Sequence, residues 1–198
     1  MEELFDINVY NDRYFEWHLK NAREYSIKTM DWFIQYYKIK SLVDFGCGIG
    51  SYLESALKNN LEKIKGYDIG AVAKKYTPNE VQQFIEYKDC TKRMMCDKYD
   101  CVISFETAEH IEPKGTDTFI LNIINSVNDN GVILFSAAPP EQNGSGHINC
   151  HPKEYWIKKF EEIGFVIDSK MREIVSLKWL ELGAPDYIYN NLIIVRKK

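Results

Sequence analysis

Hydrophobic and polar positions along the chain follow two periods in turn, which predicts helices alternating with strands. The first helix is predicted over 13–38, where Ile27, Met30, Ile34 and Tyr37 step by three and four along one face. Later strands are expected at 41–45, 63–68, 82–86, 100–104, 131–136, 164–168 and within the closing "YNNLIIVRKK" (189–198), with helices at 50–59, 70–75, 116–127, 152–163 and around 177–182. Such alternation indicates a mostly parallel sheet covered by helices on both faces.

The helix that follows the fifth strand has signals at both of its ends. Pro152 suits its first position, and Gly164 stands where it must stop. Trp156, Phe160 and Ile163 form one apolar stripe between them. We therefore expect these three side chains to face the core.

Composition narrows the class of protein. At 198 residues and 45% hydrophobic content, one domain is expected over 1–198, with a helical cap at 1–38 and a core at 39–198. The net charge of −4 argues against a surface that follows a nucleic-acid backbone and favours a small-molecule partner. The sequence contains no apolar run long enough for a membrane span and no pattern of a signal peptide, which predicts a cytoplasmic protein without a membrane partner. Five cysteines without a C-x-x-C pair indicate reduced thiols.

A glycine-rich loop joins the first strand of the sheet to the next helix. In "VDFGCGIG" (43–50), Gly46, Gly48 and Gly50 occupy alternate positions. Glycines there let the backbone turn sharply and approach a ligand at the helix N-terminus. A dinucleotide fingerprint beginning at Gly46 would need glycine at the position of Ser51, so the loop argues against a nicotinamide cofactor.

Acidic residues follow the next two strands. Asp68 ends the second strand, where a carboxylate can accept hydrogen bonds from both hydroxyls of a ribose. Asp89 comes after the third strand, where it can accept from an exocyclic amine such as that of adenine, with Cys90 beside the ring. Either acid alone is more often a solvated strand end. At the ends of successive parallel strands, the two acids and the glycine loop indicate an adenosine-shaped crevice.

These motifs together resemble the class I S-adenosylmethionine-dependent methyltransferases. The resemblance rests on "VDFGCGIG", the two acids and "YDCVISFETAEHIEP", an E-x-x-E-H stretch, and it extends from about residue 39 to 168. It implies an α/β, Rossmann-like class I methyltransferase fold, with a mostly parallel seven-stranded sheet and an antiparallel last strand, and S-adenosyl-L-methionine as the cofactor. The cofactor-binding residues that it implies are Asp44, Gly46, Cys47, Gly48, Asp68, Ile69, Asp89, Cys90 and Phe105.

The resemblance also suggests where catalytic groups would lie. Methyl transfer from a sulfonium is an in-line displacement, and it needs a base only where the acceptor must lose a proton. The loops after the fourth and fifth strands would reach the cofactor methyl group, which makes His110 and His147 the candidate bases. His151 directly precedes Pro152 and is expected at the helix cap instead.

The acids and histidines of "FETAEH" (105–110) allow two interpretations. Glu106, Glu109, His110 and His147 would make a two-acid, two-histidine set of the kind that binds divalent cations. The alternative is a loop held by hydrogen bonds, as in methyltransferases with a similar stretch that use no metal. We favour the second interpretation and expect no metal.

The predicted function is transfer of a methyl group to an oxygen or nitrogen of a small molecule such as a sugar or a secondary metabolite. An RNA methyltransferase is an alternative, in which "KEYWIKK" (153–159) would supply lysines and an aromatic platform, although Trp156 fits the core better. A non-catalytic cofactor-binding module is another alternative, and a nicotinamide dehydrogenase is the weakest. The sequence does not indicate the oligomeric state.

Overall fold

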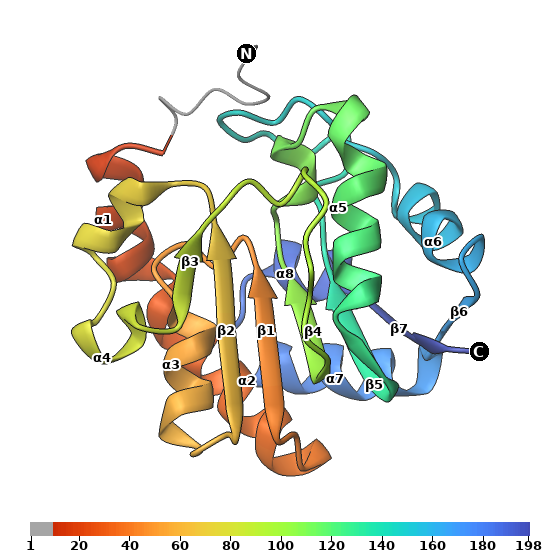
Figure 1. The fold of residues 1–198 in the computed structure, drawn as a ribbon, viewed down its shortest axis with the longest axis horizontal. Helices are drawn as coiled ribbons and strands as arrows, with labels where there is room; N and C mark the ends of the chain where they lie inside the picture. Colours follow the sequence, from red (N-terminus) through yellow and green to blue (C-terminus); the bar gives the residue numbers. More distant parts are fainter. Residues whose placement is uncertain (1–9) are drawn as a thin grey trace.

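The computed structural model describes residues 10–198, which form a seven-stranded sheet with helices on both of its faces (Figure 1). The strand order is β3-β2-β1-β4-β5-β7-β6, and the first five strands in this order pair in parallel. The last strand of the chain, β7, pairs antiparallel with both β5 and β6. The predicted Rossmann-like architecture with an antiparallel last strand is therefore confirmed. Residues 1–9 of the predicted N-terminal cap lie outside the described residues.

The elements follow one another in the order that the periodicity predicts, with added short helices. The strands are β1 Ser41–Phe45, β2 Lys63–Asp68, β3 Ile85–Tyr87, β4 Tyr99–Ser104, β5 Val127–Phe135, β6 Phe165–Ile167 and β7 Ile193–Lys197. The helices are α1 Asp12–Asn21, α2 Arg23–Tyr37, α3 Ser51–Lys58, η2 Ala71–Lys75, α4 Asn79–Gln82, η3 Ala108–His110, α5 Pro113–Asn125, α6 Lys153–Glu161, α7 Ser169–Glu181 and α8 Asp186–Asn191. Within the described part of the chain, no helix combines the length and the apolar surface that crossing a membrane requires.

Two apolar layers bury the two faces of the sheet. Helices α5 and α6 pack on one face through side chains such as Phe119 and Trp156. Helices α2, α3 and α7 pack on the other through side chains such as Phe33, Leu53 and Trp179. Because both faces are covered, the carboxyl edge of the parallel strands is the natural place for a ligand crevice.

The predicted helix over 13–38 is in fact two helices that meet at Ala22. Helix α2 faces the sheet through Met30 and Ile34, whereas Phe15 of α1 belongs to a separate small apolar cluster with Ile49 and Ala73. One straight helix cannot present both surfaces, so the chain bends at this buried alanine. As a result, α1 lies beside the carboxyl ends of β2 and β3, near η2 (Figure 1).

Two further predictions about helices are wrong in part. Helix α6 ends at Glu161, and Ile163 leaves the apolar stripe with 44% of its surface exposed, while Trp156 and Phe160 are fully buried. Only a short helix was expected around 177–182, but α7 begins at Ser169, because the Asp168 side chain accepts a hydrogen bond from the Met171 amide and caps it.

Other boundaries shift by a few residues. Pro78 precedes the short helix α4, so the third strand begins at Ile85 instead of position 82. Pro113 begins α5 three residues before the predicted start at 116, in the position where a missing N–H costs nothing. Residues 186–191, predicted in part as strand, form α8 before β7 begins.

Candidate active site

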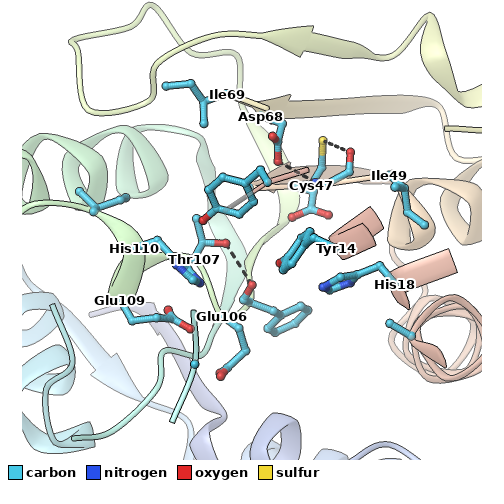
Figure 2. Close-up of a pocket in the computed structure, with 18 of the residues that line it drawn as sticks. Tyr14, His18, Cys47, Ile49, Asp68, Ile69, Glu106, Thr107, Glu109 and His110 are labelled. Carbon is cyan, nitrogen blue, oxygen red and sulfur yellow. Dashed lines mark hydrogen bonds between the residues drawn. The ribbon is translucent and has the colours of Figure 1, made fainter. Parts of the chain in front are cut away.

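A cavity of about 550 Å³ opens at the carboxyl ends of β1, β2 and β4, and α1 forms part of its wall. Figure 2 shows residues that line it. One half of its wall consists of the glycine loop and the acids that follow β2 and β3. The other half consists of η3 and of the loop between β5 and α6, which contains His147. The sequence-predicted residues that line it are Asp44, Gly46, Cys47, Gly48, Asp68, Ile69, Asp89, Cys90, Phe105, Glu106, Glu109, His110 and His147.

The two central glycines of the loop are needed for different reasons. Gly46 has φ +84°, and a Cβ at this position would lie 2.2 Å from Thr107 Oγ1. Gly48 has φ +51°, and a Cβ there would meet no atom within 4 Å. Close packing against the β4 side of the cleft therefore explains Gly46, whereas Gly48 leaves open space that a ligand can occupy.

Main-chain amides on both sides hold the Asp68 carboxylate in place. It accepts hydrogen bonds of 2.7 Å from the amide of Gly48 and of 2.7 Å from the amide of Gly70. Burial raises the pKa of Asp68, and these N–H donors oppose that rise. The carboxylate is thus fixed at the rim of the glycine loop, with its remaining lone pairs available to a ligand hydroxyl.

The Asp44 carboxyl lies deeper, at the end of β1, with 2% of the residue exposed. Its Oδ2 atom has no hydrogen-bond partner among residues 10–198. Burial, and then the nearby Asp68 carboxylate, raise the pKa of Asp44 well above its usual value. A buried carboxyl in this state would be stabilised by a cation bound in the cavity.

The far end of the cavity is bordered by Asp89 and Cys90. Asp89 Oδ1 accepts from the Thr91 amide at 2.8 Å and from the Thr91 hydroxyl at 2.5 Å, whereas Oδ2 forms only a 3.8 Å ion pair with the largely exposed Lys92 ammonium. Burial raises the pKa of the Cys90 thiol, and it raises that of Cys47 in the same way. Both thiols are therefore neutral and act as small apolar wall groups.

Phe105 lies at the floor of the cavity, where the chain leaves β4. Its ring contacts Tyr52 edge-on with centroids 5.0 Å apart, and Trp179 with centroids 5.6 Å apart. These contacts fix the ring against α3 and α7. Phe105 thus provides a rigid apolar surface where the cofactor-binding residues meet the loop of acids and histidines.

Glu106 and Glu109 are three residues apart but have different surroundings. Glu106 has φ +46°, and its carboxylate accepts from Gln142 Nε2 at 2.6 Å and from Asn191 Nδ2 at 3.4 Å. Glu109 is fully buried, and neither of its carboxylate oxygens has a hydrogen-bond partner in the described part of the chain. Burial, and then the charge of Glu106, raise the pKa of Glu109 well above its usual value.

The structure brings His110 and His147 together although 36 residues separate them in the chain. Their ring centroids are 4.9 Å apart in an edge-on contact. His110 Nδ1 lies 3.0 Å from the Gly146 carbonyl oxygen, and His147 Nδ1 lies 3.1 Å from the Gln142 carbonyl oxygen. Because a carbonyl oxygen only accepts, each Nδ1 is assigned the proton and each Nε2 keeps a lone pair. Burial lowers the pKa of His110 to about 4, so its ring is neutral near pH 7.

His151 is outside this group. It stacks on Tyr155 with ring centroids 3.7 Å apart, and its Nε2 lies 3.0 Å from Asn149 Oδ1. The prediction that it belongs to the region of the helix cap, and not to the catalytic loop, agrees with this geometry. It provides a matched control for His110 and His147.

Sequence reasoning missed the residues that α1 adds to the cavity. Tyr14 and His18 project from α1 toward the space between Asp68 and Glu106 (Figure 2). Their rings pack together with centroids 4.4 Å apart, and burial lowers the pKa of His18 to about 4. The spacing of four residues was visible in the sequence, but only the bend at Ala22 turns this face toward the cavity.

Comparison with known proteins identifies a matching family model and several solved structures with a similar fold. A family model described as a methyltransferase domain matches residues 12–170. A comparison with curated proteins gives no match.

Solved structures match most of the chain at low sequence identity. Streptomyces venezuelae DesVI has a TM-score of 0.69 at 12% identity, covering 94% of this chain and 98% of its own. The sugar N-methyltransferase KedS8 from Streptoalloteichus has a TM-score of 0.69 at 10% identity, with coverage of 100% and 96%. The O-methyltransferase of a Brevibacillus brevis trans-AT PKS multienzyme, in complex with S-adenosyl-L-homocysteine, has a TM-score of 0.63 at 16% identity, with coverage of 100% and 81%. Because these identities are low, the comparison shows a similar fold only.

Proposed function

Because the chain belongs to the family of methyltransferase domains, we propose that it transfers a methyl group from S-adenosyl-L-methionine to an oxygen or nitrogen atom of a small molecule. The observation that carries the proposal is that one cavity joins the acids at the carboxyl ends of β1, β2 and β3 to the Glu109, His110 and His147 cluster. A donor bound at the acids and an acceptor bound at the cluster would meet within one cavity.

The half of the cavity near the glycine loop suits the cofactor. Open space over Gly48 would admit the methionine portion, Asp68 would accept from the ribose hydroxyls, and Asp89 Oδ2 would accept from the adenine amine. The Asp68 carboxylate would also place negative charge near a sulfonium, and that cation would in turn favour ionisation of the buried Asp44 carboxyl. When bound, the cofactor supplies an electrophilic methyl group on sulfur.

The opposite half suits a neutral or cationic acceptor. Tyr14, His18, Tyr25 and Tyr187 contribute aromatic walls, and the hydroxyls of the last two lie 3.3 Å apart. Among the described residues that line the cavity, Lys88 is the only lysine or arginine, and it lies next to Asp89 at the adenine end. An acceptor that carries phosphate or carboxylate would therefore find no cationic partner near the reacting atoms.

In the proposed reaction, the acceptor oxygen or nitrogen bonds to the methyl carbon as the carbon–sulfur bond breaks and its electron pair stays on sulfur. A hydroxyl or ammonium acceptor must also lose a proton. The Nε2 lone pairs of His110 and His147 are placed to accept it, since each Nδ1 already donates to a carbonyl. Exclusion of water beneath α1 would protect the sulfonium from hydrolysis.

Two side chains of the segment considered for RNA binding are engaged within the protein. Trp156 is fully buried in the layer beneath α6, and Lys159 of the same segment pairs with Asp117 at 2.6 Å. Neither side chain is therefore free to stack on a base or to follow a phosphate backbone.

Calorimetry with S-adenosyl-L-methionine and S-adenosyl-L-homocysteine tests the cofactor half of the proposal. We expect binding in the micromolar range, and no heat at about 1 mM ligand would overturn the proposal. Transfer of a labelled methyl group to a panel of phenols, amines and amino sugars then tests the acceptor half. Binding without transfer to any acceptor would favour the non-catalytic module instead.

A further inference from the structure

Three potential metal ligands converge on the acceptor side of the cavity. Glu109 and His110 come from η3, after β4, and His147 comes from the loop between β5 and α6. One donor atom from each lies within 4.8 Å of the others. Donors bound at about 2.1 Å to one ion lie about 3.0–4.2 Å apart, so small side-chain rotations would complete the set. Figure 2 shows the Glu109 carboxylate beside the His110 ring.

The state of Glu109 is the observation that points to a ligand. The residue is 0% exposed, and within residues 10–198 neither carboxylate oxygen accepts a hydrogen bond. Its main-chain oxygen accepts from the amides of Ile148 and Asn149, each at 2.9 Å, which fixes η3 against the loop that contains His147. A buried carboxyl without donors is costly unless a cation compensates it.

The two histidines are oriented as metal ligands usually are. His110 Nδ1 contacts the Gly146 carbonyl oxygen, and His147 Nδ1 contacts the Gln142 carbonyl oxygen. These contacts fix both rings and leave the lone pair of each Nε2 free to bind a metal. A partner on the second ring nitrogen is the usual outer-shell device in metal sites. Gly144 allows the ring of His147 to lie close, since a Cβ at this glycine would lie 2.0 Å from His147 Nε2.

We propose that Glu109, His110 and His147 bind a divalent metal ion of the Zn²⁺ or Mn²⁺ type. Two imidazoles with one carboxylate suit such ions, and three protein ligands leave positions open for water or an acceptor oxygen. Glu106 does not belong to the set, because amides of Gln142 and Asn191 already hold its carboxylate.

This inference rests on the proposed function for its role, because the open positions would face the acceptor. With an ion bound, His110 and His147 would hold the metal instead of accepting a proton. The site would then favour acceptors with an oxygen that can coordinate, such as a phenol or a vicinal diol. A loop held only by hydrogen bonds, the arrangement favoured from the sequence, would depend on the amides of Glu109 and Ala138, which oppose the rise of the Glu109 pKa but do not reach hydrogen-bond geometry with either carboxylate oxygen.

The test measures metal binding directly, without an acceptor. The full chain is purified without chelator for elemental analysis, then stripped with a chelator and titrated with Co²⁺ by visible absorption and with Zn²⁺ and Mn²⁺ by calorimetry. We expect one ion per chain. Glu109→Gln keeps the side-chain shape, and Glu109→Gln and His147→Ala should each lower affinity by more than the roughly 100-fold upper range for outer-shell changes. His151→Ala should bind like the unaltered chain.

Binding of S-adenosyl-L-homocysteine, measured on the same preparations, separates folding from ligation. A variant that retains this binding but loses the metal supports the site. Failure of Co²⁺, Zn²⁺ and Mn²⁺ to bind the unaltered chain at about 1 mM would overturn the inference, and so would equal metal affinity in Glu109→Gln and His151→Ala. Metal binding without any binding of S-adenosyl-L-homocysteine would refute the proposed function but would still support the metal site.

Discussion

Alanine at Gly46 should cost more stability than alanine at Gly48, whereas alanine at Gly48 should weaken ligand binding more. Both glycines have positive φ, of +84° and +51°, so alanine at either position carries a backbone cost of about 1–2 kcal/mol. Only at Gly46 does the new Cβ meet packed atoms, since it would lie 2.2 Å from Thr107 Oγ1 and 2.5 Å from Thr107 Cγ2. Overpacking of this kind adds about 1–3 kcal/mol.

The expected losses in the free energy of unfolding are therefore about 2–5 kcal/mol for Gly46→Ala and about 1–2 kcal/mol for Gly48→Ala. For ligand affinity the ranking of the two variants is reversed, and Gly48→Ala should show the larger loss. The Gly48 Cβ would project into open space beside the Gly48 amide that donates to Asp68, where the cofactor is expected. Gly48→Ala should therefore fold and yet bind S-adenosyl-L-homocysteine at least tenfold more weakly.

Urea unfolding followed by tryptophan fluorescence measures the first quantity, and calorimetry at a temperature where both variants are folded measures the second. A double variant, Gly46→Ala with Thr107→Ser, removes Cγ2, one of the three Thr107 atoms that would clash, and should recover part of the lost stability. Two results would refute the reasoning: equal stability of the two alanine variants, or unchanged product affinity in Gly48→Ala.

Three other predictions follow from the described contacts. Asp68→Asn should weaken binding of S-adenosyl-L-homocysteine at least tenfold and lower stability by about 1–3 kcal/mol, because the amide NH2 that replaces one oxygen cannot accept, so the amide of Gly48 or of Gly70 loses its acceptor. Unchanged affinity in calorimetry would remove Asp68 from the cofactor site. For His18, the folded pKa near 4 lies below the unfolded value of 6.5, so the unfolded chain binds more protons between these pH values, and stability should fall as pH drops from 6.5 to 4 with a slope of up to about 1.4 kcal/mol per pH unit. His18→Phe should flatten that part of the urea-derived profile, and an identical profile would contradict the assignment. Arg23→Ala should cost at most about 1 kcal/mol through loss of its 2.8 Å pair with Glu54, because the pair is partly exposed, and a loss that persists unchanged in 1 M salt would argue against an electrostatic origin.

The core of the fold could be predicted because its signals are local. β1 ends directly before Gly46 and β2 ends at Asp68, and both strands match the predicted bounds 41–45 and 63–68. Asp68 lies at the carboxyl edge of the sheet simply because it is the last residue of a parallel strand. Because the alternation predicts a parallel sheet, residues at the carboxyl ends of its strands are expected at one edge.

Helix α7 was missed in part although its signals were present. Asp168 has the residue type of an N-cap, and Met171, Val175 and Trp179 follow at four-residue spacing as the buried side chains. Exposed Leu177 interrupts that stripe in the sequence, and its exposed position on α7 becomes evident only when the packing of α2 against α7 is known. Tertiary contacts decide here which of several apolar residues face inward.

The roles of the two glutamates could not be read from their spacing. On a continuous helix, Glu106, Glu109 and His110 would share one face, but Glu106 adopts φ +46° and only Ala108–His110 form a helical turn. That change directs Glu106 toward amides from two distant segments and leaves Glu109 buried without donors. Which carboxylate is satisfied thus depends on Gln142 and Asn191, which are 36 and 85 residues away from Glu106.

The cofactor half of the cavity could be predicted from the sequence better than the acceptor half. The acids of the cofactor half lie at strand ends, so their places are set by the sheet and are tied to sequence position. The acceptor half is assembled from α1, η3 and the loop that contains His147, and its geometry depends on the bend at Ala22 and on main-chain contacts between η3 and Asn149. A substitution at either of these two points should therefore alter acceptor choice before it alters cofactor affinity, because the sheet continues to hold Asp68 in place.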